Sequence, residues 1–307
     1  MITASGLTKK YRQKTAVEDV SFTVETGKVT GFLGPNGAGK STTMRLMLGL
    51  DSGSGKTTFD GKALQQYEQP AGVVGILLEA KAFHPTRTAR NHLSILATAG
   101  GIDQKRVDEV LDIVGLKEVA KKGPGKFSLG MSQRLGIAAA ILGEPKYLLL
   151  DEPANGLDPE GIAWLRQFIK DYADKGNAVF VSSHLLSEMS QMADNVVVIG
   201  KGKLIASTSM AALIAGNSHG SVFVRSSGLA GLEKLLRRQN ISFSRRNNGL
   251  DVQGVQTDEV GKLAYEANVT VLELAPHAAS LEEAFLEITA GAQEYHASDS
   301  NEKKVKR

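Results

Sequence analysis

Apolar residues in the first two thirds of the chain come in short runs separated by stretches with helical spacing. The runs at 29–33, 73–78, 147–150 and 178–181 are mostly apolar, as strands buried on both faces are. Residues 40–50 follow the first run with the spacing of a helix. Buried strands that alternate with helices predict an α/β domain built on a largely parallel sheet.

Two further features complete the predicted first domain, which we place at residues 1–217. Between Thr88 and Leu142 the pattern changes to helical spacing, which predicts a helical subdomain at about 80–143. The segment 196–205 has two apolar runs around Gly-Lys-Gly and predicts a hairpin that ends this domain.

Shorter units follow a polar linker at 217–220. Their order between residues 221 and 274 is strand, helix, strand, strand, helix, strand. This order predicts a small ferredoxin-like α+β accessory domain at 221–290. The last stretch, 291–307, is polar and unpatterned, so we predict a disordered tail.

Composition excludes several classes of protein. The chain has 307 residues, of which 42% are hydrophobic, enough for at least one core and about two domains. No apolar run approaches the ~20 residues that span a bilayer, and the start lacks the pattern of a secretory signal. There is no cysteine, which excludes disulfides and thiol catalysis. The net charge of +3 is too small to indicate nucleic acid as a partner, and none is expected.

A phosphate-binding motif lies between the first buried strand and the helix after it. Residues 34–42, Gly-Pro-Asn-Gly-Ala-Gly-Lys-Ser-Thr, fit the pattern G-x-x-x-x-G-K-[ST]. Backbone N–H groups of such a loop, at a helix N-terminus, bind phosphate. We expect Lys40 to reach the β- and γ-phosphates of a nucleotide, Ser41 to hold Mg²⁺, and Thr42 to lie near the α-phosphate.

A second fragment has a similar composition but predicts no site. Residues 53–58 read Gly-Ser-Gly-Lys-Thr-Thr, yet the position five before Gly55 is Leu50, where the motif needs glycine. The sequence after it continues as a strand. We interpret this fragment as a turn.

Two carboxylates end the buried run at 147–150. Asp151 is placed to hold Mg²⁺ through water, and Glu152 points to the other side and can polarise an attacking water. The phosphate loop alone would leave kinases, GTPases, helicases and transporters open. The two carboxylates narrow this set and favour a nucleotide hydrolase. A GTPase is disfavoured because no Asn-Lys-x-Asp segment is present.

Between these two sites, residues 127–134 read Phe-Ser-Leu-Gly-Met-Ser-Gln-Arg. This stretch resembles the signature motif of ABC-family ATPases, normally Leu-Ser-Gly-Gly-Gln. The order of phosphate loop, signature, Asp-Glu strand, Gly156-Leu157-Asp158 and Ser183-His184 also resembles that family over about residues 1–220. The Leu129 and Met131 variants look like the branch that exports drugs, antibiotics and bacteriocins.

The resemblance implies further roles. In the family two subunits pack head to tail, and the signature of one caps the γ-phosphate bound by the other; here Ser128 and Gly130 would do so. His184 would contact the γ-phosphate beside Glu152, and Tyr11 lies where an aromatic residue stacks on adenine. ATP and Mg²⁺ are the implied cofactors.

One position departs from the family pattern. Where a glutamine usually follows a strand, helping to ligate Mg²⁺ and contacting the membrane partner, this chain has Glu79. Carboxylate is a stronger ligand for Mg²⁺ than an amide. Whether Glu79 contacts the metal directly is left open by the sequence.

Motifs and resemblance together give three groups of expected site residues. The catalytic residues are Glu152 and His184. The metal ligands are Ser41, Asp151 and Glu79. The nucleotide-binding residues are Tyr11, Gly34, Pro35, Asn36, Gly37, Ala38, Gly39, Lys40, Ser41, Thr42, Ser128 and Gly130.

The expected protein is the ATPase subunit of an ABC exporter, held on the cytoplasmic face of the membrane by separate membrane-spanning permease subunits. It would form a homodimer, or a heterodimer with a similar ATPase, when ATP binds. The segment from Glu79 to Leu93, with Phe83 and Arg87, is the expected contact with the membrane subunits; alternatively, Phe83 fills the boundary between two lobes. The rival interpretation is an ABC-type ATPase that acts on ribosomes, DNA or chromosomes, although one cassette without long heptads makes this less fitting.

Overall fold

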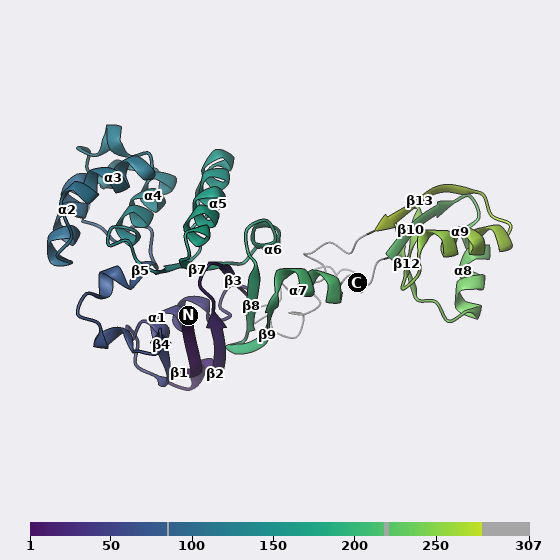
Figure 1. Ribbon diagram of the computed structural model, residues 1–307. Helices are drawn as coiled ribbons and strands as arrows, with labels where there is room; N and C mark the ends of the chain where they lie inside the picture. Colours follow the sequence, from purple (N-terminus) through teal and green to yellow (C-terminus); the bar gives the residue numbers. More distant parts are fainter. Residues whose placement is uncertain (85, 218–220, 278–307) are drawn as a thin grey trace, which may run out of the picture. The chain divides into compact units, whose positions relative to one another are not determined.

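The computed structural model describes residues 1–84, 86–217 and 221–277, which form two compact units (Figure 1). The first unit extends to Met210 and the second begins at Ala211, each with a hydrophobic core of its own. The predicted tail at 291–307 lies outside the described residues. Within the described residues, no helix combines the length and apolar character needed to cross a membrane.

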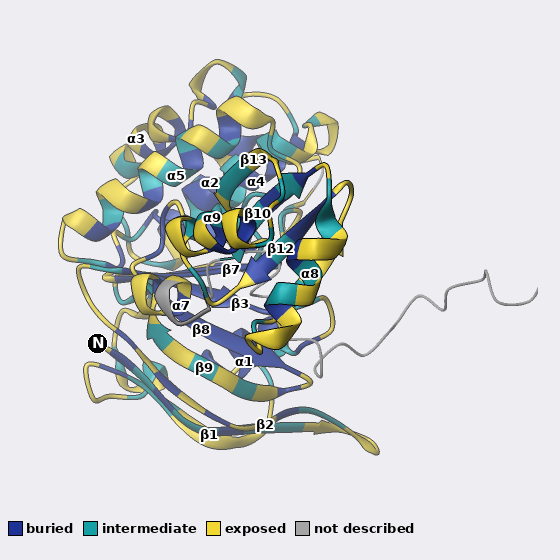
Figure 2. Ribbon diagram, turned by 90° about the vertical axis from the view of Figure 1, so that its right-hand side faces the viewer, coloured by how far each residue is buried: buried dark blue, intermediate teal, exposed yellow. Residues whose placement is uncertain are grey.

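A six-stranded sheet is the centre of the first unit. Its strands, in spatial order, are β5 (Val74–Leu77), β6 (Tyr147–Leu150), β7 (Ala178–Ser183), β3 (Val29–Leu33), β8 (Asn195–Gly200) and β9 (Lys203–Ser209). Neighbouring strands from β5 to β8 are parallel, and β9 pairs antiparallel with β8. The middle strands are buried along nearly their whole length (Figure 2). The predicted α/β class, parallel sheet and closing hairpin are therefore confirmed.

An antiparallel sheet covers part of this core. It consists of β2 (Lys14–Val24), β1 (Ile2–Tyr11) and β4 (Ser54–Phe59), in that order. Phe22 of β2 stacks on Phe180 at a centroid distance of 5.3 Å, and Phe180 stacks on Phe32 at 5.0 Å. These rings join the two sheets into one core. The fragment 53–58 is not a turn, because β4 includes Gly55 and Lys56, but it forms no second phosphate loop.

Helices connect the strands described so far, and one follows β9. They are α1 (Lys40–Met47), α2 (Ala89–Ala99), α3 (Lys105–Ile113), α4 (Leu129–Ala140), α5 (Pro159–Asp174), α6 (Leu186–Met189) and α7 (Met210–Asn217), with short 3₁₀ helices at Leu64–Gln66, Pro70–Gly72, Lys117–Val119 and Pro124–Lys126. Side-chain caps begin three of the α-helices: Thr88 accepts from the N–H of Asn91, and Ser128 and Asp158 do the same for α4 and α5.

The helical subdomain consists of α2, α3 and α4, within the range predicted from the sequence. Val107, Val110 and Leu111 of α3 are fully buried, as the helical spacing indicated. Its helix α4 approaches β5 so closely that a Cβ at Gly75 would lie 1.9 Å from the carbonyl oxygen of Ala140. Only glycine permits this contact, which seats α4 directly on the sheet.

The second unit has a four-stranded antiparallel sheet with the order β11 (Phe243–Arg246), β12 (Gly249–Gln253), β10 (Ser221–Ser226), β13 (Val271–His277). Helices α8 (Leu229–Arg238) and α9 (Thr257–Glu266) connect its strands, and their apolar sides join one core with Val222, Val224 and Leu250. This element order and strand order confirm the ferredoxin-like topology.

Candidate functional site

The site forms where three neighbouring parallel strands end. β3, β7 and β6 lie side by side, and their carboxyl ends lead into the phosphate loop, into His184 and into Asp151-Glu152 respectively. In open α/β sheets this edge is the usual place for ligands. Segments more than 100 residues apart in the sequence thus meet at one edge.

The phosphate loop joins β3 to α1 without a break. Gly37 and Gly39 have φ of 80° and 106°, conformations that favour glycine. A Cβ at Gly39 would also lie 2.6 Å from the carbonyl oxygen of Ala16. The backbone therefore needs glycine here to turn and begin the helix with its N–H groups free to face an anion.

Lys40 is folded into this loop and is only 6% exposed. Its ammonium donates to the carbonyl oxygens of Gly34, at 2.7 Å, and Pro35, at 3.4 Å. It also lies 3.2 Å from Oε1 of Glu152. That oxygen is buried and accepts no hydrogen bond of proper geometry from the described residues, so the contact is an ion pair. The Lys40 ammonium is therefore oriented toward an anionic oxygen, as it would be toward a phosphate.

A cavity of about 450 Å³ opens in front of the loop. Of the residues predicted from the sequence, it is lined by Tyr11, Pro35, Asn36, Gly37, Gly39, Lys40, Ser41, Thr42 and Glu152. Gly34 and Ala38 are buried beneath it. The cavity therefore joins the predicted aromatic residue, the phosphate loop and the predicted base.

Tyr11 lies at the end of β1 with its side chain 47% exposed. Its hydroxyl donates to Oδ2 of Asp51 at 2.8 Å, and this hydrogen bond, with burial and the charge of Asp51, raises the pKa of Tyr11. The ammonium of Lys9 lies 4.8 Å from the ring centroid. The ring is thus anchored by its hydroxyl and remains accessible at the cavity.

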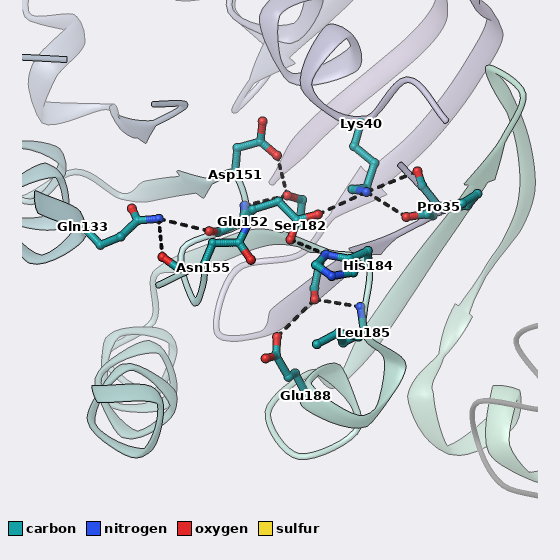
Figure 3. Close-up of polar contacts among 12 residues, drawn as sticks. Pro35, Lys40, Gln133, Asp151, Glu152, Asn155, Ser182, His184, Leu185 and Glu188 are labelled. Carbon is teal, nitrogen blue, oxygen red and sulfur yellow. Dashed lines mark hydrogen bonds and ion pairs between the residues drawn. The ribbon is translucent and has the colours of Figure 1, made fainter. Parts of the chain in front are cut away.

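Glu152 stands between a lysine and a histidine (Figure 3). Its Oε2 lies 2.9 Å from Nδ1 of His184, while Oε1 faces Lys40. Its carboxylate is 20% exposed and His184 is 35% exposed, so water can reach both side chains. The two predicted catalytic residues are brought together.

Asp151 points away from Glu152 and accepts a hydrogen bond from Oγ of Ser182 at 2.5 Å. It lines a larger cavity, of about 820 Å³, together with Ser41 and Glu79. All three predicted metal ligands therefore border one space, and Ser41 borders both cavities. Their donors are hydroxyl and carboxylate oxygens, the set that Mg²⁺ prefers.

The signature residues lie elsewhere on the same unit. Ser128 caps α4, with Oγ accepting from the N–H of Met131 at 3.1 Å, and Gly130 is in the first turn. Both line a third cavity, of about 540 Å³, with Gly156, Leu157 and Asp158. Neither lines the cavity at the phosphate loop. A single chain therefore separates the two predicted halves of the nucleotide site.

Comparison with known proteins identifies the family. Residues 17–155 match the family model described as ABC transporter. The chain is 45% identical over 209 residues to the bacitracin transport ATP-binding protein BcrA of Bacillus licheniformis, covering 67% of this chain and 68% of that protein. It is 37% identical over 206 residues to the lantibiotic transport ATP-binding protein SrtF of Streptococcus pyogenes, covering 67% and 89%.

The chain belongs to the ATP-binding proteins of ABC transporters. As an ABC ATPase it binds and hydrolyses ATP. Its fold resembles the dimeric post-hydrolysis structure of the ATP-binding cassette MJ0796 bound to ADP and Pi, with a TM-score of 0.62 and 22% identity over 68% of this chain and 99% of that one. Residues 220–282 match a separate model, described only as a domain of unknown function.

Several residues of this ABC ATPase site were not predicted from the sequence. The cavity at the phosphate loop is also lined by Lys14, Thr15, Ala16, Lys201 and Gly202. Lys14 pairs with Tyr11 across the β1–β2 turn, so a hairpin predicted there would have indicated it. Ser182 and Gln133 contact the backbone of the predicted base. The sequence signal for Ser182 was the pair of serines, 182 and 183, that ends an otherwise apolar run.

Proposed function

We propose that this chain is the ATP-hydrolysing subunit of an exporter whose membrane-spanning subunits are separate polypeptides, and that it works on the cytoplasmic face of the membrane. The observation that carries the proposal is the Glu152 carboxylate, which follows β6 and is held between Lys40 of the phosphate loop and His184. Because its relatives include bacitracin and lantibiotic transport proteins, we propose an antibiotic or peptide as cargo.

The chain's own residues divide the work of hydrolysis. Lys40 exchanges its contact with Glu152 for the phosphates of ATP, which it neutralises. Glu152, released from the lysine, accepts a proton from the attacking water as that water bonds to the γ-phosphorus and ADP leaves. His184 holds the carboxylate in position through Nδ1.

Mg²⁺ suits the oxygen donors of Ser41, Asp151 and Glu79. When bound, it neutralises phosphate charge and acts as a Lewis acid. The hydroxyl of Ser182 holds the Asp151 carboxylate in place as a ligand for the ion. Ser41 lies in the first turn of α1 and lines the same cavity. Glu79 is exposed at the rim of the same cavity, where it is available either to the ion or to a partner.

A dimer follows from the separation of the two half-sites. Ser128 and Gly130 lie at the N-terminus of α4, which favours an anion, but they are not at the phosphate loop of their own chain. A second subunit, identical or similar, can present this surface to the first subunit's nucleotide. Two such contacts in a head-to-tail pair complete two sites.

The 820 Å³ cavity also supports the predicted contact with a membrane subunit. Apart from the three metal-site residues it is lined largely by apolar side chains of β5, α2 and α4, such as Leu77, Leu96 and Leu135. Phe83 borders it and contacts the His92 ring at a centroid distance of 6.3 Å. Burial and the charge of Arg87 lower the pKa of His92, so the cavity wall favours a neutral imidazole. An apolar groove with an aromatic rim suits a partner's short helix.

The test is to look for an adjacent gene that encodes membrane spans and to measure assembly of this chain with its product. Phe83→Ala and Arg87→Ala, singly and together, are expected to reduce co-purification in detergent while basal ATP hydrolysis stays within twofold. Ile113→Ala is the matched control, because Ile113 is 41% exposed on α3 and does not line the groove. Normal assembly with a reduced basal rate would show that Phe83 packs internally. If no adjacent gene encodes membrane spans, the rival ATPase with a non-membrane partner is favoured.

A further inference from the structure

The proposed base has a strained backbone. Glu152 has φ of 47°, in the left-handed region that glycine adopts freely and that other residues enter only at a cost in free energy. Asparagine and aspartate are found there more often, but glutamate has no such preference. A strained residue persists when the surrounding structure holds it, and such residues cluster at functional sites.

Both backbone polar groups of Glu152 are held. Its N–H donates to Oγ of Ser182 at 2.8 Å, and Ser182 is fully buried. Its carbonyl oxygen accepts from the N–H of Asn155 at 3.2 Å, closing a turn, and also from Nε2 of Gln133 at 3.3 Å (Figure 3). The same nitrogen of Gln133 donates to the carbonyl oxygen of Asn155 at 3.2 Å. One amide thus ties both ends of the turn that follows the base.

The geometry requires a donor at this position. Gln133 is 4% exposed, and its Nε2 faces the carbonyl oxygens of Glu152 and Asn155. If the amide were turned by 180°, its own oxygen would face these two oxygens, and three acceptors would meet without a donor. Its Oε1 is buried and accepts no hydrogen bond within the described part of the chain. An unsatisfied buried oxygen is costly. The two hydrogen bonds that Nε2 donates therefore explain a glutamine here despite the cost of its unpaired oxygen.

We propose that Gln133 is a positioning residue for ATP hydrolysis, which holds Glu152 in the conformation that aims its carboxylate between Lys40 and His184. The inference rests on the proposed role of Glu152 as the base. Gln133 belongs to α4, which is capped by Ser128 and has Gly130 in its first turn. The same amide therefore connects the signature helix to the turn that begins at Glu152.

The decisive variant is Gln133→Met, which keeps the side-chain length and removes the donor. Small displacements of a reacting group lower rates by about 10- to 100-fold, so we expect a fall of that size in kcat. The affinity for ATP should stay within twofold, because Gln133 does not line the phosphate-loop cavity. Gln104→Met is the matched control: Gln104 donates to the Ser94 carbonyl oxygen in the helical subdomain, and its loss should leave kcat unchanged.

A double-mutant cycle separates positioning from general support of the fold. In a Glu152→Gln background, Gln133→Met should lower the remaining turnover by less than twofold, because the group that it positions is already gone. A full additional loss, or an equal loss of ATP affinity, would overturn the inference, as would an unchanged kcat in Gln133→Met alone. If Glu152→Gln itself hydrolyses ATP normally, the proposed base is wrong instead, and the two failures are distinguished.

Discussion

Replacing Lys40 by methionine tests the phosphate loop most sharply. The ammonium is 6% exposed and contacts the carbonyl oxygens of Gly34 and Pro35 and the carboxylate of Glu152. In the ATP complex we expect this charge to move to the phosphates. A hydrogen bond to a charged group contributes about 1.5–3 kcal/mol. At about 1.4 kcal/mol per tenfold change in Kd, its loss predicts an ATP affinity roughly 10- to 150-fold lower.

The fold should tolerate this change. Methionine has the length of the lysine stem and fills the same buried channel without a charge to desolvate. Glu152 loses its cation but is 20% exposed and keeps His184 at 2.9 Å, so its charge is not isolated. We therefore expect the free energy of unfolding without nucleotide to fall by about 1–3 kcal/mol, because buried acceptors lose their donor, and the protein should stay folded.

Titration with ATP and Mg²⁺ by calorimetry, paired with denaturant unfolding of the same samples, measures both quantities. Lys146→Met is the control, because Lys146 is exposed and pairs with Asp60, away from the cavity. An unchanged ATP affinity in Lys40→Met would refute the assignment of the loop. A large loss of stability would show instead that the lysine serves the fold.

Three further predictions concern the metal, the acid stability and the second unit. Glu79→Gln should preserve ATPase activity but shift its Mg²⁺ dependence; an identical Mg²⁺ titration would place Glu79 in the partner groove. Burial opposes ionisation of Asp60, but hydrogen bonds from Lys146, the N-terminal ammonium and Tyr147 outweigh it and hold the pKa of Asp60 well below its usual value. The stability that Asp60 contributes is therefore present above about pH 4 and lost as the pH falls further. Asp60→Asn should cost about 0.5–1 kcal/mol in urea unfolding at pH 7, since the carboxylate is 44% exposed, and less at pH 3; a difference that does not shrink in acid would contradict this. Deleting residues 221–307 should leave ATP binding within twofold, and a folded product that no longer binds would show that the second unit is part of the site.

The sequence predicted the elements whose pattern is local and unbroken. Four buried runs became the parallel strands β3, β5, β6 and β7 with boundaries shifted by at most two residues. The element order of the accessory domain was also predicted, because its strands and helices are short, amphipathic and separated by clear turns. The boundary between domains near residue 217 stays a prediction.

The N-terminal sheet was not predicted, and its geometry explains why. β1 has register shifts against β2 between Ala4 and Leu7 and again between Leu7 and Lys9. Each shift breaks the alternation of buried and exposed residues that identifies a strand. The pattern over residues 2–11 therefore has no period of two to detect.

The site residues that belong to a continuous motif were predicted, and those brought in from distant segments were not. The phosphate loop and the Asp-Glu strand end can be found by spacing alone. Gln133 and Ser182 act on Glu152 from positions 19 and 30 residues away, through a side chain-to-backbone contact and the pairing of β6 with β7. No local pattern contains such contacts, because they depend on how α4 and β7 pack beside β6.

Glu152 is the proposed base of an ATPase whose nucleotide is held by the phosphate loop. The most direct test measures ATP binding and phosphate release on the same preparation of Glu152→Gln. Loss of a general base predicts turnover about 10²- to 10⁴-fold below the wild type, with ATP bound as tightly and an ATP-dependent dimer trapped on gel filtration. Turnover near the wild-type rate, or loss of ATP binding together with turnover, would contradict the account.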